Sequence, residues 1–343
     1  MKTNTDFAKF LSRFLSEYLP HERNMSPNTI LAYRDTFVQF IGYMKDIQGI
    51  RIEKLTLDKI TKDIVLGFLE WVQNKRNCSI ATCNYRLAAI HSFILYLQYE
   101  DIVHLEEWQK ILSIKAKKTG KKSINYLTVE AIKLLLEQPD TMTLKGRRNL
   151  ALLALMYDTG ARVQEIIDLT PDSINIASMP YTIRLLGKGQ KYRIVPLMKE
   201  QVILLRRYME ENDLTEKYHL KHPLFFNSRG EKLTRAGVTY ILKTYVIMAR
   251  MINPNLIPES ISCHSLRHSK AMHLLQAGVN LVYIRDILGH SSIQTTDVYT
   301  RADSKQKREA LEKSYTTLIP EGEVIRLWDK NHDLLEWLKK LQK

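Results

Sequence analysis

The segment CHSLRHSKAMHLLQAGVNLVYIRDILGHSSIQTTDVYTR runs from Cys263 to Arg301 and combines helix-forming residues with many ionisable side chains. It contains four histidines, three arginines and two tyrosines. The pattern predicts a helix that begins at Cys263 or Ser265, a second helix capped by Asn280 and ended by Gly289, and a third helix after it. A function for this chain must explain what these cations neutralise and what the phenols do.

The first of these helices carries a candidate anion site at its N-terminus. His264 lies in the first turn, and Arg267, three residues further on, shares its face. Because a helix N-terminus already favours anions, this pair is suited to a phosphate group. His264 and His268 have an i,i+4 spacing that zinc sites use, but HExxH and a third ligand at a usual spacing are missing. We therefore predict no metal site.

Two upstream segments place further charges at chain breaks. In GRRNLALLALMYDTGARVQEIIDLT a buried helix is predicted to break at Gly160, before a second helix that carries Arg162 and Glu165. In YTIRLLGKGQKYRIVPL, two β-branched runs flank Gly-Lys-Gly, which predicts a β-hairpin with Lys188 at its tip. Each of these charges alone would be taken for a solvated surface residue.

The first 113 residues predict a small helical bundle. SPNTILAYRDTFVQFIGYMKDI opens with Ser26 as an N-cap and Pro27 as the first helical residue, and its apolar residues recur every three or four positions. SIATCNYRLAAIHSFILYLQYE repeats this pattern from Ser79. Further helices are expected near residues 5–19 and 61–75.

The net charge of +14 is unevenly distributed along the chain. Residues 1–113 contribute +1, residues 114–123 contribute +5, residues 124–317 contribute +8, and residues 318–343 contribute zero. A basic excess in a linker and one large domain suits a polyanion that runs between two domains, although solubility alone explains it equally well. The linker lysines, predicted to bind DNA, are Lys115, Lys117, Lys118, Lys121 and Lys122.

Other features exclude several classes of protein. No apolar run approaches the roughly 20 residues that span a bilayer, and the N-terminus lacks the apolar region of a signal peptide. We therefore expect a cytoplasmic protein without a membrane partner. The three cysteines, Cys78, Cys83 and Cys263, form no CxxC pair and no even set, so they are predicted to be buried thiols.

Four segments in order, TGARVQEI, LGKGQKYRIVPL, HSLRHS and LGHSSIQTTDVYT, resemble the catalytic domain of the tyrosine recombinases, also called the phage integrase family. The resemblance covers Leu127 to Arg301 well. It extends less specifically to SPNTILAYRDTFVQFIGYM and YRLAAIHSFILYL, which resemble the helical core-binding domain of that family.

The resemblance implies a mainly α fold with a small antiparallel β-sheet in the C-terminal domain, an α+β class. The expected organisation is a helical, SAM-like core-binding domain (1–113), a basic linker (114–123), a catalytic domain (124–317) and a C-terminal tail helix (318–343). The two domains would form a clamp around duplex DNA, and the tail is expected either to cap its own domain or to dock on a neighbouring subunit.

The resemblance also implies a mechanism. Tyr299 would attack a DNA phosphodiester and form a 3′-phosphotyrosyl link, and His264 would serve as general acid and base. Arg162 and Arg267 would hold the non-bridging oxygens. Lys188 would protonate the leaving 5′-oxygen.

Two further positions match the family pattern. His290 would hydrogen-bond the scissile phosphate, and Glu165 would orient the site, although an intrahelical ion pair explains Glu165 almost as well. His268 is expected to pack and bond structurally, and Tyr283 to pack in the core. Side-chain cations stand where a metal nuclease holds magnesium, so no cofactor and no metal are expected.

The predicted function is site-specific recombination of double-stranded DNA by a homotetramer through a Holliday junction, with an accessory protein as an optional partner. It would serve integration, excision or transposition of a mobile element, or resolution of chromosome or plasmid dimers. Three alternatives stay open: a type IB topoisomerase, a non-catalytic DNA-binding regulator and a metal-dependent nuclease.

Overall fold

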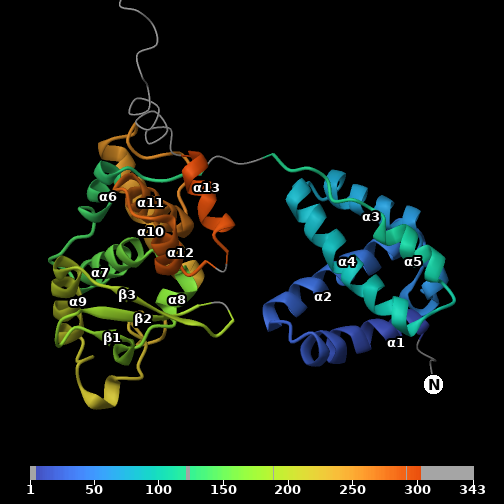
Figure 1. Cartoon of the computed structure of the whole chain (residues 1–343), viewed down its shortest axis with the longest axis horizontal. Helices are drawn as coiled ribbons and strands as arrows, with labels where there is room; N and C mark the ends of the chain where they lie inside the picture. Colours follow the sequence, from blue (N-terminus) through green and yellow to red (C-terminus); the bar gives the residue numbers. More distant parts are fainter. Residues whose placement is uncertain (1–4, 121–123, 188, 291, 303–343) are drawn as a thin grey trace, which may run out of the picture. The chain divides into compact units, whose positions relative to one another are not determined.

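The computed structural model describes residues 5–120, 124–187, 189–290 and 292–302. The chain divides into two compact units, residues 1–122 and 123–343 (Figure 1). Helices dominate both units, and the second unit also contains a three-stranded antiparallel sheet. The predicted fold class is therefore confirmed. The division into units falls near the C-terminal end of the predicted linker.

The first unit is a bundle of helices that begin at the predicted caps. The side chain of Ser26 accepts a hydrogen bond from the backbone of Thr29, and that of Ser79 accepts one from Thr82, so both act as N-caps. The elements are α1 (Asp6–Arg13), a π-helical turn (Phe14–Glu22), α2 (Pro27–Asp46), two 3-10 turns (Ile52–Lys54 and Leu57–Lys59), α3 (Lys62–Asn74), α4 (Ile80–Glu100) and α5 (Leu105–Leu112).

An aromatic cluster forms the core of this unit. The ring of Phe93 lies 5.1 Å from the rings of both Phe14 and Phe37, and all three are buried. Trp108 of α5 is fully enclosed in the same core. Because such rings bury large apolar areas, they fix the π-helical turn, α2, α4 and α5 against one another.

The start of the predicted linker is attached to this unit. The backbone N–H of Lys117 donates to Asn84 Oδ1 at 2.9 Å, and its carbonyl accepts from Asn84 Nδ2 at 2.8 Å. Lys117 Nζ donates to Gln73 Oε1 at 2.6 Å. Lys115 and Lys118 are exposed beside it. The remaining linker lysines, Lys121 and Lys122, lie outside the described residues.

The second unit contains the predicted hairpin. Strands β1 (Ile174–Asn175), β2 (Thr182–Leu186) and β3 (Tyr192–Pro196) pair in that order. Its helices are α6 (Val129–Leu136), α7 (Leu144–Thr159), α8 (Val163–Ile167), α9 (Lys199–Glu211), α10 (Arg235–Ile252), α11 (Cys263–Gln276), α12 (Leu281–Leu288) and α13 (Gln294–Ala302), with 3-10 turns at Pro171–Ser173 and Lys217–His219.

Two apolar clusters position the segments that carry the predicted site. The larger one surrounds α7, which is buried along most of its length, and it includes the inner face of the sheet. The smaller one joins α11, α12 and α13 through Met272, Ile284, Leu288 and Tyr299. Since α11 also packs against α7, the three short helices are anchored to the main core.

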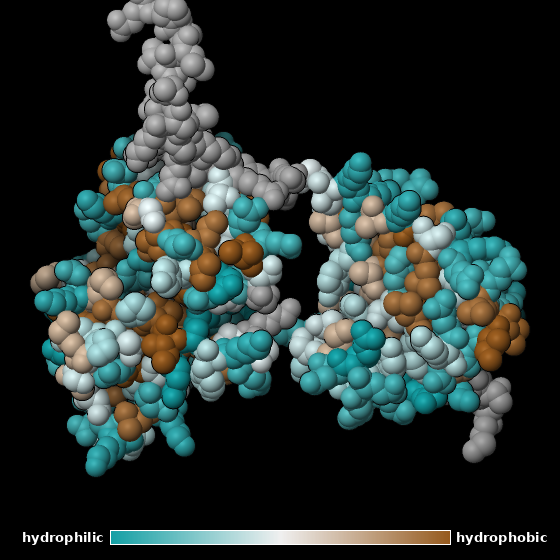
Figure 2. Space-filling view, in the orientation of Figure 1, coloured by the Kyte–Doolittle hydropathy of each residue, from teal (hydrophilic) through white to brown (hydrophobic). Residues whose placement is uncertain are grey.

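Charged and polar residues cover most of the face of each unit in Figure 2, and apolar residues appear there as separate patches. In the described ranges, every helix is too short or too polar to span a bilayer.

Some details differ from the predictions. The first helix of the opening segment begins at Cys263, one of its two expected starts, with Ser262 as an N-cap that was not predicted. Tyr283 is 65% exposed, so the prediction that it packs in the core is wrong. Cys83 is buried as predicted, but Cys78 and Cys263 are only half-buried, and all three thiols are free. Lys188 and the predicted tail helix (318–343) lie outside the described residues.

Candidate active site

A sharp break after α7 begins the site. Gly160 has a left-handed backbone (φ +57°), and a Cβ atom there would lie 2.7 Å from Leu288 Cδ2. Both the conformation and the close approach therefore require glycine. The turn directs the chain into α8, with Arg162 at the N-cap position. The predicted helix, break and helix in this segment are confirmed.

A buried carboxylate connects two arginines at this turn. Glu165 is 5% exposed. Its Oε1 accepts from Arg162 Nη1 at 2.9 Å and from Arg193 Nη1 at 2.9 Å. Its Oε2 accepts from the backbone N–H of Arg162 at 2.7 Å and from Arg193 Nη2 at 2.6 Å. Glu165 thus joins the start of α8 to strand β3.

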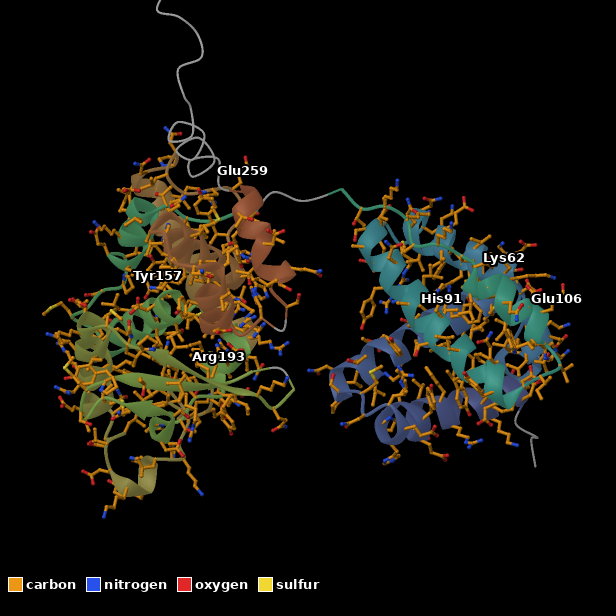
Figure 3. All side chains as sticks on the ribbon, in the orientation of Figure 1. Lys62, His91, Glu106, Tyr157, Arg193 and Glu259 are labelled. Carbon is orange, nitrogen blue, oxygen red and sulfur yellow. The ribbon has the colours of Figure 1, made fainter. Side chains whose placement is uncertain are left out.

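Although burial alone would raise the pKa of Glu165, the Arg193 guanidinium and the bonds from Arg162 hold this pKa below its usual value. Glu165 is therefore ionised at neutral pH. Arg193 lies where the hairpin approaches α8 and α12 (Figure 3). Its Nε donates to the carbonyl of Ile287 at 2.9 Å. The sequence analysis missed Arg193. The available signal was the alternation of β3, because Arg193 and buried Val195 share one face of the strand.

Arg267 occupies the centre of the site and is 3% exposed. Its Nη1 donates to the carbonyl of Gly160 at 2.8 Å, and its Nη2 donates to the carbonyl of Leu288 at 2.6 Å. Burial, with a smaller effect from Arg162, lowers the pKa of Arg267 to about 10, so the side chain stays cationic at neutral pH. It thereby connects the C-terminal ends of α7 and α12.

The turn between α12 and α13 contributes a neutral histidine. Gly289 ends α12 in the left-handed region (φ +66°), and its carbonyl accepts from Arg162 Nη2 at 3.3 Å. His290 Nδ1 lies 2.9 Å from the hydroxyl of Thr296, which is fully buried. Burial and the nearby Arg267 lower the pKa of His290 to about 4, so its ring is neutral at neutral pH.

Tyr299 of α13 is 3% exposed, and its hydroxyl lies 3.0 Å from His268 Nδ1. Its ring stacks on His290 with centroids 6.4 Å apart and an interplanar angle of 11°. Burial raises the pKa of Tyr299, whereas Arg267 and Arg162 act to lower it. The phenol is therefore protonated at rest, but cations stand close enough to stabilise its anion.

His264 lies one helical turn before His268, with ring centroids 6.3 Å apart. Partial burial, followed by Arg267 and Arg162, lowers the pKa of His264. In the described part of the chain no group of three or more histidine, cysteine or acidic side chains is arranged to hold a metal ion.

The structure thus brings most of the predicted site residues together, from three of the four segments quoted in the sequence analysis. These residues are Arg162, Glu165, His264, Arg267, His290 and Tyr299. Lys188 is outside the described residues, but the adjacent Gly187 lies near the cluster. A Cβ atom on Gly187 would be 3.6 Å from Glu165 Oε1. The start of the hairpin loop, directly after β2, therefore approaches the site.

Comparisons with known proteins match both units. A model described as the phage integrase family matches residues 125–306, more than half of the chain. A second model, the phage integrase N-terminal SAM-like domain, matches residues 11–101.

Individual relatives match over most of their length. A Sinorhizobium fredii protein named integrase/recombinase y4rC is 34% identical over 314 residues, which cover 92% of this chain and 93% of the relative. Tyrosine recombinase XerD of Oceanobacillus iheyensis is 33% identical over 300 residues, which cover 87% of this chain and 95% of the relative. The crystal structure of the XerH site-specific recombinase bound to its difH substrate, a pre-cleavage complex, matches with 25% identity and a TM-score of 0.64, covering 86% of this chain and 82% of that one.

The buried ion pairs of Glu165 with Arg162 and Arg193 predict that removing the carboxylate lowers stability with a defined pH dependence. Glu165→Gln leaves Arg193 and Arg162 without their counter-charge, so we expect the second unit to lose about 3–5 kcal/mol at pH 7. Because the folded pKa of Glu165 is lowered, its contribution is present above the unfolded value of about 4.3 and is lost as pH falls through the folded pKa. Urea unfolding between pH 7 and pH 3 measures both effects.

The matched control is Glu210→Gln, which removes an exposed carboxylate from α9. We expect it to change stability by less than about 0.5 kcal/mol. Equal unfolding free energies for Glu165→Gln and Glu210→Gln at pH 7 would contradict the role assigned to the buried pair.

The bond between Thr296 and His290 predicts a second effect. Thr296→Val keeps the shape of the side chain but leaves His290 Nδ1 without its partner, so we expect a loss of about 1–3 kcal/mol. Thr296→Ser retains the hydroxyl and should recover most of the bond, at the smaller cost of a lost methyl group. Urea unfolding of both variants tests this, and a Val variant as stable as wild type would count against the bond.

Proposed function

The chain belongs to the phage integrase family, the tyrosine recombinases, and from this we propose that it cuts and rejoins specific DNA sites through a 3′-phosphotyrosyl intermediate. The observation that carries the proposal is the convergence on Tyr299 of two arginines and three histidines from separate segments. An aromatic hydroxyl amid cations and neutral imidazoles is suited to attack on a phosphodiester, whose transition state accumulates negative charge.

Arg162 and Arg267 would bind the non-bridging oxygens of the scissile phosphate. An arginine has five N–H donors in a rigid plane, and the bonds to Gly160 and Leu288 use two of those on Arg267. These bonds hold the guanidinium in place before DNA arrives. Because the positive charge is already in position, it stabilises the transition state without reorganisation and without a metal ion.

His290 would donate a hydrogen bond to the same phosphate. Its ring is neutral, so one nitrogen carries a proton and the other accepts. If the Thr296 hydroxyl donates to Nδ1, the proton lies on Nε2, which is then the donor for a phosphate oxygen. Thr296 would therefore select the productive tautomer of His290.

The other proton transfers are assigned by the family match. Lys188 would give a proton to the 5′-oxygen as it leaves, and the adjacent Gly187 lies beside Glu165. His264 would act as general acid and base, and Glu165 would orient Arg162. Because the phosphotyrosyl link conserves the energy of the broken bond, rejoining needs no ATP.

The biological role belongs to the same proposal. We propose that the protein acts in the cytoplasm as a homotetramer on duplex DNA and exchanges strands through a Holliday junction. Integration or excision of a mobile element and resolution of DNA dimers both fit this chemistry. The relatives named integrase/recombinase and XerD support the recombinase function without separating these roles.

The central test is covalent capture of DNA. A randomised pool of nicked duplexes, in which the cut fragment diffuses away, should yield a protein–DNA adduct with the wild-type chain and none with Tyr299→Phe. Gel retardation of the denatured adduct and sequencing of the bound DNA identify the bond and the target site together.

The matched control is Tyr283→Phe, which changes an exposed tyrosine of the neighbouring helix and should leave adduct formation unchanged. A Tyr299→Phe protein that still forms the adduct would disprove the assignment of the nucleophile. A wild-type protein that binds DNA without any adduct would favour the non-catalytic regulator. Adduct formation with strand relaxation but without recombinant products would favour the topoisomerase.

The linker predicts a change in the salt dependence of DNA binding. Replacing Lys115 and Lys118 with glutamine removes two exposed charges, so the slope of log K against log salt should become less negative by about 1.8 if each contacts a phosphate. Fluorescence anisotropy between 50 and 300 mM salt is the measurement. The charge-matched pair Lys9→Gln and Lys45→Gln, on α1 and α2, should change this slope less. Equal changes for both pairs would refute direct phosphate contacts by the linker.

A further inference from the structure

We propose that His268 is a catalytic residue, the group that takes the proton from the Tyr299 hydroxyl during attack and returns it when the tyrosine leaves. The inference rests on the proposed phosphotyrosyl chemistry and deepens it. It replaces the expectation that His268 only packs and bonds structurally. It also gives His268 the acid–base role at the tyrosine that the family match assigns to His264, and His264 would then contact the phosphate.

The geometry distinguishes the two histidines. His268 Nδ1 lies 3.0 Å from the Tyr299 hydroxyl, inside the range of about 2.6–3.2 Å that proton transfer requires. Within the described ranges, the Tyr299 hydroxyl has no other hydrogen-bond partner. His264 lies one turn nearer the start of α11 and is more exposed than His268. His268 is therefore the imidazole that contacts the Tyr299 hydroxyl, and His264 is the one that is more exposed to solvent.

The charges around the pair suit a transfer from oxygen to nitrogen. Burial, then His264 and Arg267, lower the pKa of His268, so its ring is neutral and can accept a proton. Burial raises the pKa of Tyr299, so the phenol does not ionise unaided. Arg267 and Arg162 lie close enough to favour the phenolate as it forms. General-base activation needs a protonated nucleophile, a neutral base and nearby cations, and Tyr299, His268 and the two arginines supply them.

The transfer balances in both directions. In cleavage, the O–H bond of Tyr299 breaks, its proton moves to His268 Nδ1, the new P–O bond forms, and the bond from phosphorus to the 5′-oxygen breaks. The 5′-oxygen takes its proton from Lys188. In rejoining, the 5′-hydroxyl gives its proton back to Lys188 and attacks phosphorus, and the departing tyrosine recovers its proton from His268.

The test compares His268→Asn with Lys188→Ala on two substrates. Asparagine places a polar atom near the position of Nδ1 but does not accept a proton at neutral pH. On an ordinary nicked duplex, we expect cleavage to fall by about 10²–10⁴-fold in His268→Asn. On a duplex with sulfur in place of the bridging 5′-oxygen, the leaving group needs no proton, so Lys188→Ala should recover its rate and His268→Asn should not.

The pH dependence gives a second readout that a structural role would not change. Without a base, cleavage depends on the small ionised fraction of Tyr299. The rate of His268→Asn should therefore rise about tenfold per pH unit below the pKa of the tyrosine. The wild-type rate should level off once His268 is neutral.

Each contrary result has a distinct meaning. A wild-type protein that forms no adduct on any duplex would overturn the proposed function and this inference together. Wild-type activity with undiminished or faster cleavage by His268→Asn would overturn this inference alone. Rescue of His268→Asn by the sulfur substrate would also overturn it, because His268 would then act on the leaving group.

A measurement on the wild-type protein keeps the inference testable even if the variant fails to fold. Nitrogen-15 shifts of a histidine-labelled sample report which ring nitrogen carries the proton. We expect His268 in the Nε2–H form, with Nδ1 as the acceptor, and we expect Tyr299→Phe to shift the Nδ1 signal. A proton on His268 Nδ1 at neutral pH would overturn the assignment without any DNA present.

Discussion

The site depends on one electrostatic constraint: three guanidinium groups, those of Arg162, Arg193 and Arg267, lie close together, and the last two are largely buried. Like charges at such distances would repel strongly in a partly buried environment. The chain offsets the repulsion with the buried carboxylate of Glu165 and with backbone carbonyls at Gly160, Leu288 and Gly289. Two of these carbonyls lie at the end of α12 and one just after α7, where the helix dipole is negative. The positive charge is thus held in place by the fold itself, ahead of any phosphate.

This constraint explains why two glycines and a strand arginine matter to a site in which none of them has an assigned chemical role. Gly160 and Gly289 take left-handed conformations that direct their carbonyls toward the arginines, and Gly160 also lets α12 approach closely. Arg193 ties the hairpin to both Glu165 and α12. Any movement of the hairpin that carries Lys188 is therefore coupled to the carboxylate that holds Arg162. The same residues stabilise the fold and set the geometry of the cations.

Much of this could be predicted from sequence because it is local. The caps at Ser26, Ser79 and Asn280 and the helix ends at Gly160 and Gly289 follow from the backbone preferences of those residues, and all five are confirmed. The contacts that define the site chemistry are not local. Arg193 meets Glu165 across 28 positions, and His268 meets Tyr299 across 31. Helical spacing shows which residues share a face of one helix, but the packing of separate elements decides which side chains meet. For that reason Tyr283 was wrongly predicted to be buried, and the partner of His268 was not foreseen.

The arginines also affect the pKa values of the neighbouring histidines. Burial is the main cause that lowers the pKa values of His264, His268 and His290. Arg267 lowers all three further, and Arg162 also lowers those of His264 and His290, so all three rings are neutral at rest. A bound phosphate would bring negative charge between the arginines and would offset part of their field. The pKa values of the histidines would then rise, which makes each ring a stronger base at the moment when a proton must leave Tyr299. Without DNA, the same field helps to keep the imidazoles neutral, whereas burial keeps the phenol protonated against that field. The cation cluster would therefore bind the phosphate and also make the basicity of the histidines depend on the presence of the substrate.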